Sequence, residues 1–244
     1  AKTPGVWYSL PLMLLDLLFP MRSLEGAEGT WVTPSEFARL RSHLRIFETA
    51  ELRRMGLQAL DRVSAASTYR DVPLLRKAIH TFKYRRIPGL GAALQQVLLD
   101  GLQLSSPFRT NACITPVPLH FTRRFRRGFN QADILAEALA KKTSLPILPL
   151  LTRIRPTGFQ AKRKRAARFT AVKGAFRVRG GFGLGLGLGL RRKALFPNPN
   201  PNPLPFGVYL IDDLMTTGAT LDECARVLKE AGVKRVEGIV LAHG

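Results

Sequence analysis

The hydrophobic pattern near the C-terminus changes its period between residues 211 and 220. Residues 208–211 (VYLI) form a continuous apolar run of strand-forming side chains, which predicts a strand buried on both faces. From Thr220 the apolar positions recur at steps of three and four, as in an amphipathic helix: Leu221, Cys224, Ala225, Leu228 and Ala231. Gly232 is placed to end this helix. The pattern therefore predicts a buried strand, a connection over residues 215–219, and a helix.

The connection has polar residues in an unusual order. Asp212 and Asp213 follow the apolar run directly, where the strand is expected to end. Thr220 and Glu223 have the spacing of a capping box, which predicts the first turn of the helix. Free N–H groups at the start of a helix and the helix dipole favour an anion, so a phosphate group is the natural ligand here.

Upstream, helix-like and strand-like segments alternate. Apolar residues at helical spacing predict a helix over residues 74–82, which ends before Pro88, and a second helix over 90–98. The further expected elements are a strand over 112–117, a helix over 130–142 and a strand over 174–178. This alternation predicts an α/β fold in which a mostly parallel central sheet is flanked by helices.

Residues 1–60 show no recognisable chemistry and are expected to form a small N-terminal appendage to a main domain over 61–244. The apolar segment "GVWYSLPLMLLDLLFP" contains Asp16, lacks a strongly basic leader, and is shorter than the ~20 apolar residues that cross a bilayer. We expect a docking helix there, in preference to a targeting segment, and no membrane span.

Two low-complexity tracts, "GGFGLGLGLGL" (180–190) and "PNPNPNP" (197–203), lie between predicted strands. Alternating prolines remove the N–H donors that a sheet needs, and the entropy of loop closure grows slowly with length. Both tracts are expected to form one surface insertion over residues 180–203, without a catalytic role.

The charge of the chain bears on its partners. The 244 residues include 38 Lys and Arg against 17 Asp and Glu, a formal charge of +21. This charge favours nucleic acid, acidic membranes or phosphorylated substrates, although a general bias towards arginine would produce the same number. A hydrophobic content of 45% suffices for one sizeable core. Cys113 and Cys224 alone exclude a disulfide framework and a cysteine-based metal site, so a reducing, cytoplasmic location is expected.

Two acids beside a hydroxyl-rich loop suit a sugar phosphate. Asp212 and Asp213 can accept hydrogen bonds from neighbouring sugar hydroxyls or hold a metal ion. The loop offers N–H and hydroxyl donors to a phosphate from five residues: Thr216, Thr217, Gly218, Ala219 and Thr220. Each such charge-assisted bond contributes roughly 1.5–3 kcal/mol. The alternative is an ordinary strand-to-helix turn with a polar loop.

A cluster of cations lies in the loop predicted between the 112–117 strand and the 130–142 helix. Its members are suited to neutralise a pyrophosphate leaving group: Arg123, Arg124, Arg126 and Arg127. Gly128 allows a sharp turn, and Asn130 or Asp133 is placed to cap the following helix. Such a cluster is also typical of a solvated face or of a nucleic-acid-binding patch.

These motifs carry two resemblances. "LIDDLMTTGAT" (210–220) resembles the phosphoribosyl pyrophosphate signature of type I phosphoribosyltransferases. The order Pro-Val-Pro, arginines, Arg-Gly-Phe-Asn-Gln in residues 116–131 resembles the competence protein F (ComF) family, whose members carry a phosphoribosyltransferase-like domain. "LLDLLFP" (14–20) and "LLRKAIHTFKYRR" (74–86) are similar to further segments of that family.

The resemblance implies a type I phosphoribosyltransferase fold. It places Asp212 and Asp213 on the ribose hydroxyls, where they also help to hold Mg²⁺, and places the 216–220 loop on the 5′-phosphate. Residues 153–178 are similar to the mobile loop of the family, which by analogy closes over the substrate and excludes water. The matching positions are Arg153, Arg155, Thr157, Gln160 and Arg168, of which Arg155 and Gln160 are expected to bind substrate.

Part of this loop has a second interpretation, and the chain departs from the family at two places, one of which is the insertion over residues 180–203. The basic stretch 162–165 is nearly as typical of a disordered loop with affinity for nucleic acid. Many relatives carry a cysteine-rich zinc module after the "LLFP" segment, whereas residues 21–31 contain no cysteine. No structural zinc is therefore expected.

Two functions remain open. The first is phosphoribosyl transfer with release of pyrophosphate; no acceptor or general base is identified, and His80 and His120 are expected to be surface or capping residues. The second, which the competence role of the family implies, is a non-catalytic adaptor in DNA uptake that binds single-stranded DNA or the uptake machinery and retains a phosphate site. The salt dependence of binding distinguishes the two functions. When a protein contacts Z phosphates of single-stranded DNA, its log affinity falls with log salt concentration with a slope of about −0.7Z.

Overall fold

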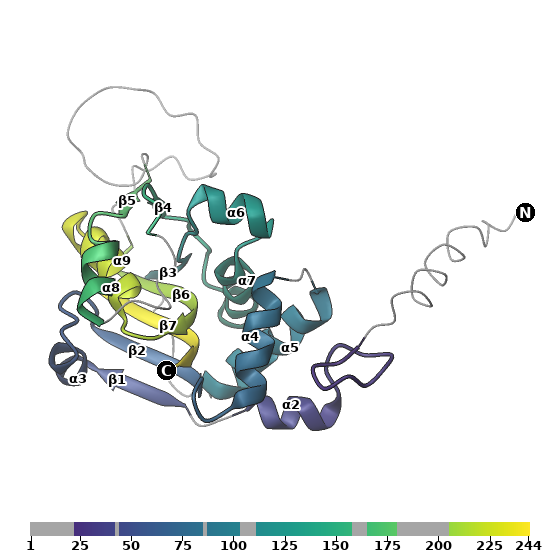
Figure 1. Cartoon of the computed structure of the whole chain (residues 1–244). Helices are drawn as coiled ribbons and strands as arrows, with labels where there is room; N and C mark the ends of the chain where they lie inside the picture. The colour runs from purple at the N-terminus through teal and green to yellow at the C-terminus, as the bar shows by residue number, and fades with distance from the viewer. Residues whose placement is uncertain (1–21, 42–43, 85–86, 103–110, 158–164, 180–204) are drawn as a thin grey trace, which may run out of the picture.

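The computed structural model describes residues 22–41, 44–84, 87–102, 111–157, 165–179 and 205–244 (Figure 1). Three features expected from the sequence lie outside these residues: the apolar segment 5–20, Gln160 and the 180–203 insertion. No helix in the described part of the chain combines the length and apolar character needed to cross a membrane.

A five-stranded sheet forms the centre of the fold, in the spatial order β1 (Arg45–Glu48), β2 (Arg62–Thr68), β7 (Arg235–His243), β6 (Gly207–Met215) and β3 (Ala112–Pro116). All neighbouring pairs are parallel except β1 with β2. The central position of β6 explains its continuous apolar sequence, because both of its faces are covered. The expected α/β fold with a mostly parallel sheet is confirmed, and it is compatible with the type I phosphoribosyltransferase fold.

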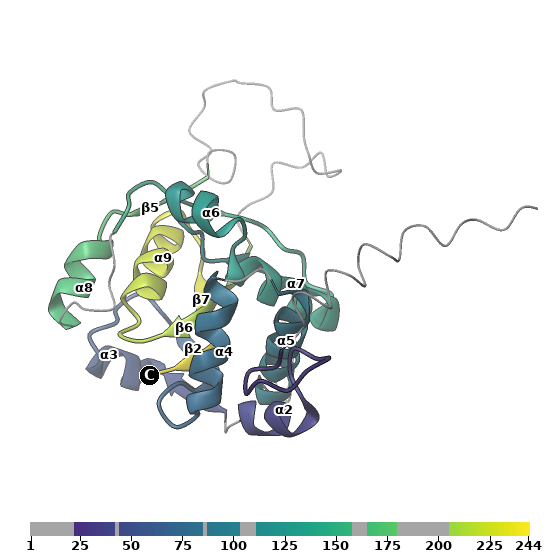
Figure 2. The ribbon, with the colours of Figure 1, turned by 45° about the vertical axis from the view of Figure 1, so that its right-hand side comes forward.

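Helices cover both faces of this sheet (Figures 1 and 2). One face carries α4 (Pro73–Tyr84), α5 (Pro88–Leu102) and α7 (Gln131–Thr143), which share a core cluster with Tyr209 and Ile211 of β6. The other face carries α9 (Ala219–Glu230), which packs against β6, β7 and α8 (Arg165–Val172). Val208 and Leu210 belong to this second cluster. The alternation along β6 follows from the two-residue period of a strand.

The segment over residues 22–60 packs closely on this core. Thr33 and Glu36 form a capping box at the start of α2 (Pro34–Leu40), and the buried Glu36 carboxylate also accepts a 2.8 Å hydrogen bond from the Ser23 hydroxyl. After α2 the chain forms β1, at the edge of the central sheet, and then α3 (Thr49–Arg54). A separate appendage ending at residue 60 stays a prediction, although β1 already lies in the central sheet.

The strand expected over residues 174–178 forms as β5 (Phe176–Val178), but it does not join the parallel sheet. It pairs antiparallel with β4 (Leu151–Arg153) in a separate two-stranded sheet. The two strands have three residues each and are separated by α8 in the chain, so their pairing depends on the tertiary fold, which strand propensity alone does not predict. In Figure 1 this small sheet lies beside α6 (Phe121–Arg127).

The expected capping box at Thr220 and Glu223 is wrong. Helix α9 begins at Ala219, and its N-cap is Gly218, which adopts φ 78° and makes no side-chain cap. The buried Glu223 carboxylate instead accepts hydrogen bonds from the Gly174 amide at 2.6 Å and from Arg226. A tertiary contact has therefore replaced a local one. At the other end, Gly232 has φ 108° directly after the helix, as expected.

Candidate functional site

The candidate site lies at the carboxyl end of β6. Asp212 and Asp213 belong to the strand itself, which continues to Met215, so the expected strand end at these acids is wrong by three residues. The carboxyl ends of the neighbouring parallel strands β3 and β7 lie at the same edge. In open parallel sheets the crevice outside this edge is where ligands bind.

Asp213 forms an ion pair with Lys83 of α4. The Lys83 Nζ lies 2.8 Å from Asp213 Oδ2, and the side chains are 21% and 11% exposed, respectively. Sequence reasoning did not identify Lys83 as a site residue. The signals were its position directly after Phe82, on the edge of the apolar stripe of α4, and its place in the 74–86 segment that resembles the ComF family.

Asp212 faces the other side, towards β4 and α9. Its Oδ1 accepts a 2.8 Å hydrogen bond from the backbone amide of Asp213. Burial, followed by the negative charge of Asp213, raises the pKa of Asp212 to about 7, while the cations Lys83 and Arg153 oppose this shift. The site thus holds one acid with an ion-pair partner and one that titrates near neutral pH.

Arg153, at the end of β4, is the cation that faces Asp212. Its guanidinium lies 5.1 Å from the Phe176 ring centroid and donates a hydrogen bond to Thr157 Oγ1. Burial lowers the pKa of Arg153, and the nearby positive charge of Arg123 adds to the effect. Among the described residues, its buried Nε has no hydrogen-bond partner. Repulsion between two close arginines makes this corner receptive to an anion.

The loop after β6 presents donors. Within the part of the chain that the structure describes, the amides of Thr216, Thr217 and Gly218 donate to no carbonyl or side chain. The amide of Ala219 makes a long 3.4 Å contact with Thr217 Oγ1. Thr220 lies in the first turn of α9, where N–H groups have no intrahelical acceptor. This loop-to-helix geometry is suited to an anion.

Gly218 has a structural reason to be glycine. Its positive φ disfavours other residues, and a Cβ atom there would lie 2.6 Å from Leu57 Cδ1. A side chain at position 218 would therefore point towards the core and not towards the open side of the loop.

The arginine cluster forms helix α6 rather than the expected loop. His120 caps its start, with Nδ1 accepting from the Thr122 amide, and Gly128 at φ 77° ends it. These two local signals allow a helix of one and a half to two turns within what was expected to be irregular. His120 is thus a capping residue, as expected, and His80 is exposed.

The four arginines of α6 face different ways. Arg123 lies close enough to Arg153 to affect its pKa. Arg124 pairs with Asp133 at 3.7 Å, Arg127 donates to Gln131 Oε1 at 2.9 Å, and Arg126 is exposed. The structure therefore brings Arg123 of this cluster close to Arg153, whereas Arg124 and Arg127 contact residues of α7.

The remaining expected residues of this region have structural contacts. Asn130 is the N-cap residue of α7 but makes no side-chain cap; its Nδ2 donates to the Val117 carbonyl and to Asp133 Oδ1. Arg155 donates to the carbonyl of Lys173, and Arg168 lies on α8. Thr157 accepts from Arg153, so it positions a site residue.

Asp212 and Asp213 are the carboxylates of the site that could hold a metal ion. Across the described residues no group of three or more His, Cys, Asp or Glu side chains could hold a metal ion. Mg²⁺ characteristically takes one or two protein carboxylates together with substrate phosphates, so Asp212 and Asp213 fit a substrate-borne Mg²⁺. Cys113 and Cys224 are buried free thiols, and burial raises the pKa of Cys113 to about 11.

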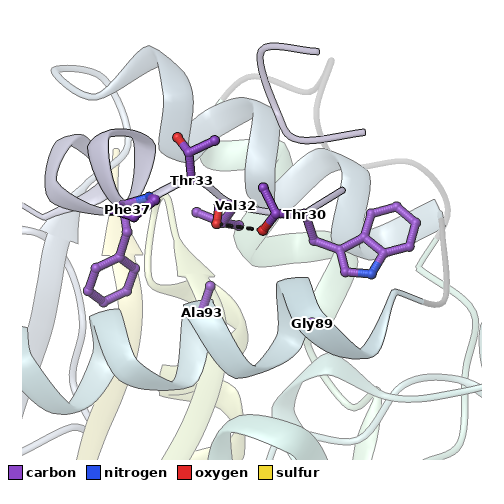
Figure 3. A pocket seen from close by; sticks show the side chains of 8 residues that line it. Thr30, Val32, Thr33, Phe37, Gly89 and Ala93 are labelled. Carbon is purple, nitrogen blue, oxygen red and sulfur yellow. Dashed lines mark hydrogen bonds between the residues drawn. The ribbon is translucent and has the colours of Figure 1, made fainter. Parts of the chain in front are cut away.

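A pocket of about 420 Å³ lies elsewhere, between α5 and the segment before and within α2 (Figure 3). Figure 3 shows Gly89 and Ala93 on one side and Thr33 and Phe37 on the other. No charged side chain lines it. It therefore offers no positive charge to a phosphate ligand.

Comparison with known proteins gives consistent relatives, although no family model matches the chain. Competence protein F of Haemophilus influenzae is 31% identical over 126 residues, which cover 51% of this chain and 47% of that protein. The DNA utilization protein YhgH of Salmonella typhimurium is 29% identical over 180 residues, covering 72% and 69%.

A third relative is Competence protein ComFC of Bacillus subtilis, 28% identical over 165 residues, covering 68% of this chain and 57% of that protein. The match thus spans about half the length of the Haemophilus protein and more of the other two. Together with the motifs and the parallel sheet, these similarities support the resemblance of this chain to the competence protein F (ComF) family.

Proposed function

We propose that this protein binds phosphoribosyl pyrophosphate at the carboxyl end of β6. The observation that carries the proposal is the continuous order of three features: Asp212 and Asp213 in the strand, a loop whose amides have no acceptor among the described residues, and the start of α9. In this arrangement the loop over 216–220 holds the 5′-phosphate, and the acids accept hydrogen bonds from the ribose hydroxyls. Arg153 and Arg123 provide positive charge for the pyrophosphate.

The reaction that fits this ligand is phosphoribosyl transfer. The acceptor forms a bond to C1 of ribose while the bond from C1 to the pyrophosphate oxygen breaks, so positive charge develops on the sugar. The acids stabilise that charge, and the arginines stabilise the departing pyrophosphate. Bound Mg²⁺ would supply neutralisation of the pyrophosphate charge.

A role in DNA uptake is the biological setting that we propose. The relatives are named for competence and for DNA utilization, and the chain carries a formal charge of +21. A second candidate function, single-stranded DNA binding by an adaptor without turnover, is favoured by two exposed phenylalanines on the basic helix α6.

Isothermal titration calorimetry with phosphoribosyl pyrophosphate, with and without Mg²⁺, tests the ligand. We expect magnesium-dependent binding that exceeds binding of plain pyrophosphate. The Asp212→Asn/Asp213→Asn double variant is expected to lose it. Glu137→Gln is the matched control, because Glu137 is an exposed acid on α7. Equal affinity of the wild-type protein for pyrophosphate and phosphoribosyl pyrophosphate, or full binding by the double variant, contradicts the proposed sugar-holding role.

A further inference from the structure

Helix α6 exposes two large aromatic rings to solvent. Phe121 is 72% exposed and Phe125 is 92% exposed. Residues four apart in a helix lie on the same face, with Cβ atoms about 5–6 Å apart. Leaving two phenylalanines in water forgoes the favourable free energy of burying their side chains. Such a pair on one short helix indicates a binding surface.

The same helix is strongly basic. Its sequence, FTRRFRR, contains four arginines and no acid. Arg124 and Arg126 are exposed, and Arg126 has no ion-pair partner among the described residues. We call this surface the α6 face (residues 121–126). Its alternation of aromatic rings and cations distinguishes it from an apolar protein-docking patch. Its charge is complementary to a polyanion.

The α6 face is held in place by its neighbours. The His120 side chain is buried, and its ring centroid lies 4.5 Å from that of Phe121. His120 Nδ1 lies 2.8 Å from Thr122 Oγ1, so the imidazole that supports Phe121 is itself anchored. Gly128 ends the helix with a 2.6 Å bond from its amide to the Arg124 carbonyl. A surface held in this way loses little entropy when a ligand binds.

We propose that the α6 face binds single-stranded nucleic acid, with bases stacked on Phe121 and Phe125 and with Arg124 and Arg126 on the phosphates. Aromatic side chains stack on unpaired bases, whereas the bases of a duplex are already stacked on each other. The inference specifies a site for the DNA-handling role proposed above, and it does not require binding of phosphoribosyl pyrophosphate. Arg123 of the same helix lies close to Arg153, so the α6 face is next to the candidate sugar-phosphate site.

Fluorescence anisotropy with a labelled deoxythymidine 20-mer, at several salt concentrations, tests the proposal on the full chain. We expect Phe121→Ala and Phe125→Ala each to weaken binding at least about fivefold, since stacking is worth about 1–3 kcal/mol per base. Their salt slopes remain those of the wild-type protein. Arg126→Gln is expected to show the opposite pattern. The slope of log affinity against log salt concentration is reduced in magnitude by about 0.7, and the loss of affinity is smaller at high salt.

Two controls separate stacking from general charge and from misfolding. Phe125→Tyr keeps a ring and is expected to keep the affinity. Phe206→Ala removes an aromatic side chain that is 45% exposed at the opposite, amino end of β6, and is expected to change nothing. Unchanged thermal melting of the Phe121 and Phe125 variants establishes that they fold.

Several results overturn the inference. Absence of binding to the 20-mer by the wild-type protein does so, as does full affinity of the Phe121→Ala/Phe125→Ala double variant. Equal effects of the phenylalanine variants on a duplex and on the 20-mer would exclude base stacking. If the double variant binds the 20-mer normally but loses a protein partner in a pull-down, the α6 face is a protein-docking surface. Loss of phosphoribosyl pyrophosphate binding alone would affect only the proposed ligand of β6.

Discussion

The ammonium group of Lys83 and the carboxylate of Asp213 lie 2.8 Å apart and join α4 to the carboxyl end of β6. Both side chains are mostly buried, so their attraction is screened less than that of a surface pair. Lys83 also compensates the negative charge that two adjacent acids accumulate, because it opposes the upward shift in the pKa of Asp212. One lysine on a helix thus stabilises a site carried by a strand.

Replacement of Lys83 tests this role. Lys83→Met leaves Asp213 mostly buried without its partner, so we expect the free energy of unfolding to fall by about 1–3 kcal/mol. Urea denaturation measures the change, and Lys83→Arg, which keeps the charge, is expected to restore most of it. If Lys83→Met is as stable as the wild-type protein at pH 8, the ion pair contributes nothing.

The raised pKa of Asp212 predicts a pH dependence of stability. The folded-state pKa of about 7 lies above the unfolded value of ~3.9, so the protonated acid is favoured by folding. This contribution is present below the unfolded pKa and is lost as pH rises towards 7. We expect the free energy of unfolding of the wild-type protein, relative to Asp212→Asn, to decrease between pH 4 and 7. Parallel pH profiles of the two proteins would contradict the assignment.

Binding of magnesium and phosphoribosyl pyrophosphate is expected to show the opposite trend. A carboxylate that holds a metal ion or accepts from sugar hydroxyls must be ionised, so affinity rises as Asp212 loses its proton around pH 7. Arg153 favours the ionised form, and Arg153→Met therefore shifts the rise to higher pH as well as weakening binding. Calorimetry at pH 6, 7 and 8 measures both effects. A rise at the same pH in both proteins would show that Arg153 does not act on Asp212.

Substitution of Gly218 is expected to affect stability first. Gly218→Ala strains a backbone with φ 78° and brings Cβ to 2.6 Å from Leu57, so we expect a loss of about 1–3 kcal/mol. Gly232→Ala is the matched control, because φ there is 108° but no atom lies within 4 Å of the new Cβ. In a double-mutant cycle with Leu57→Ala, the two losses are expected to be less than additive, and the difference measures the steric part. Equal losses in both glycine variants would leave strain as the sole cause.

Local patterns predicted most elements of the fold. The apolar runs at 208–211 and 112–117 became β6 and β3, and the stripe over 74–82 became α4. Other features depended on partners distant in the chain. The Glu223 carboxylate accepts a hydrogen bond from the Gly174 amide instead of capping α9. Residues 174–178 pair with β4 instead of entering the parallel sheet. Propensity does not reveal which of two available partners a group will take.

The amino-acid order alone identifies the acids, the threonine-rich loop and the arginines, because residue type and spacing are local properties that persist whatever the chain packs against. The tertiary structure determines which cation lies close to which acid. Lys83 reaches Asp213 because α4 lies on the face of β6 that carries Tyr209 and Ile211, and Arg153 reaches the neighbourhood of Asp212 because β4 lies on the other. Charges act through space over a few ångströms, so their pairing follows from how the layers stack and not from distance along the chain.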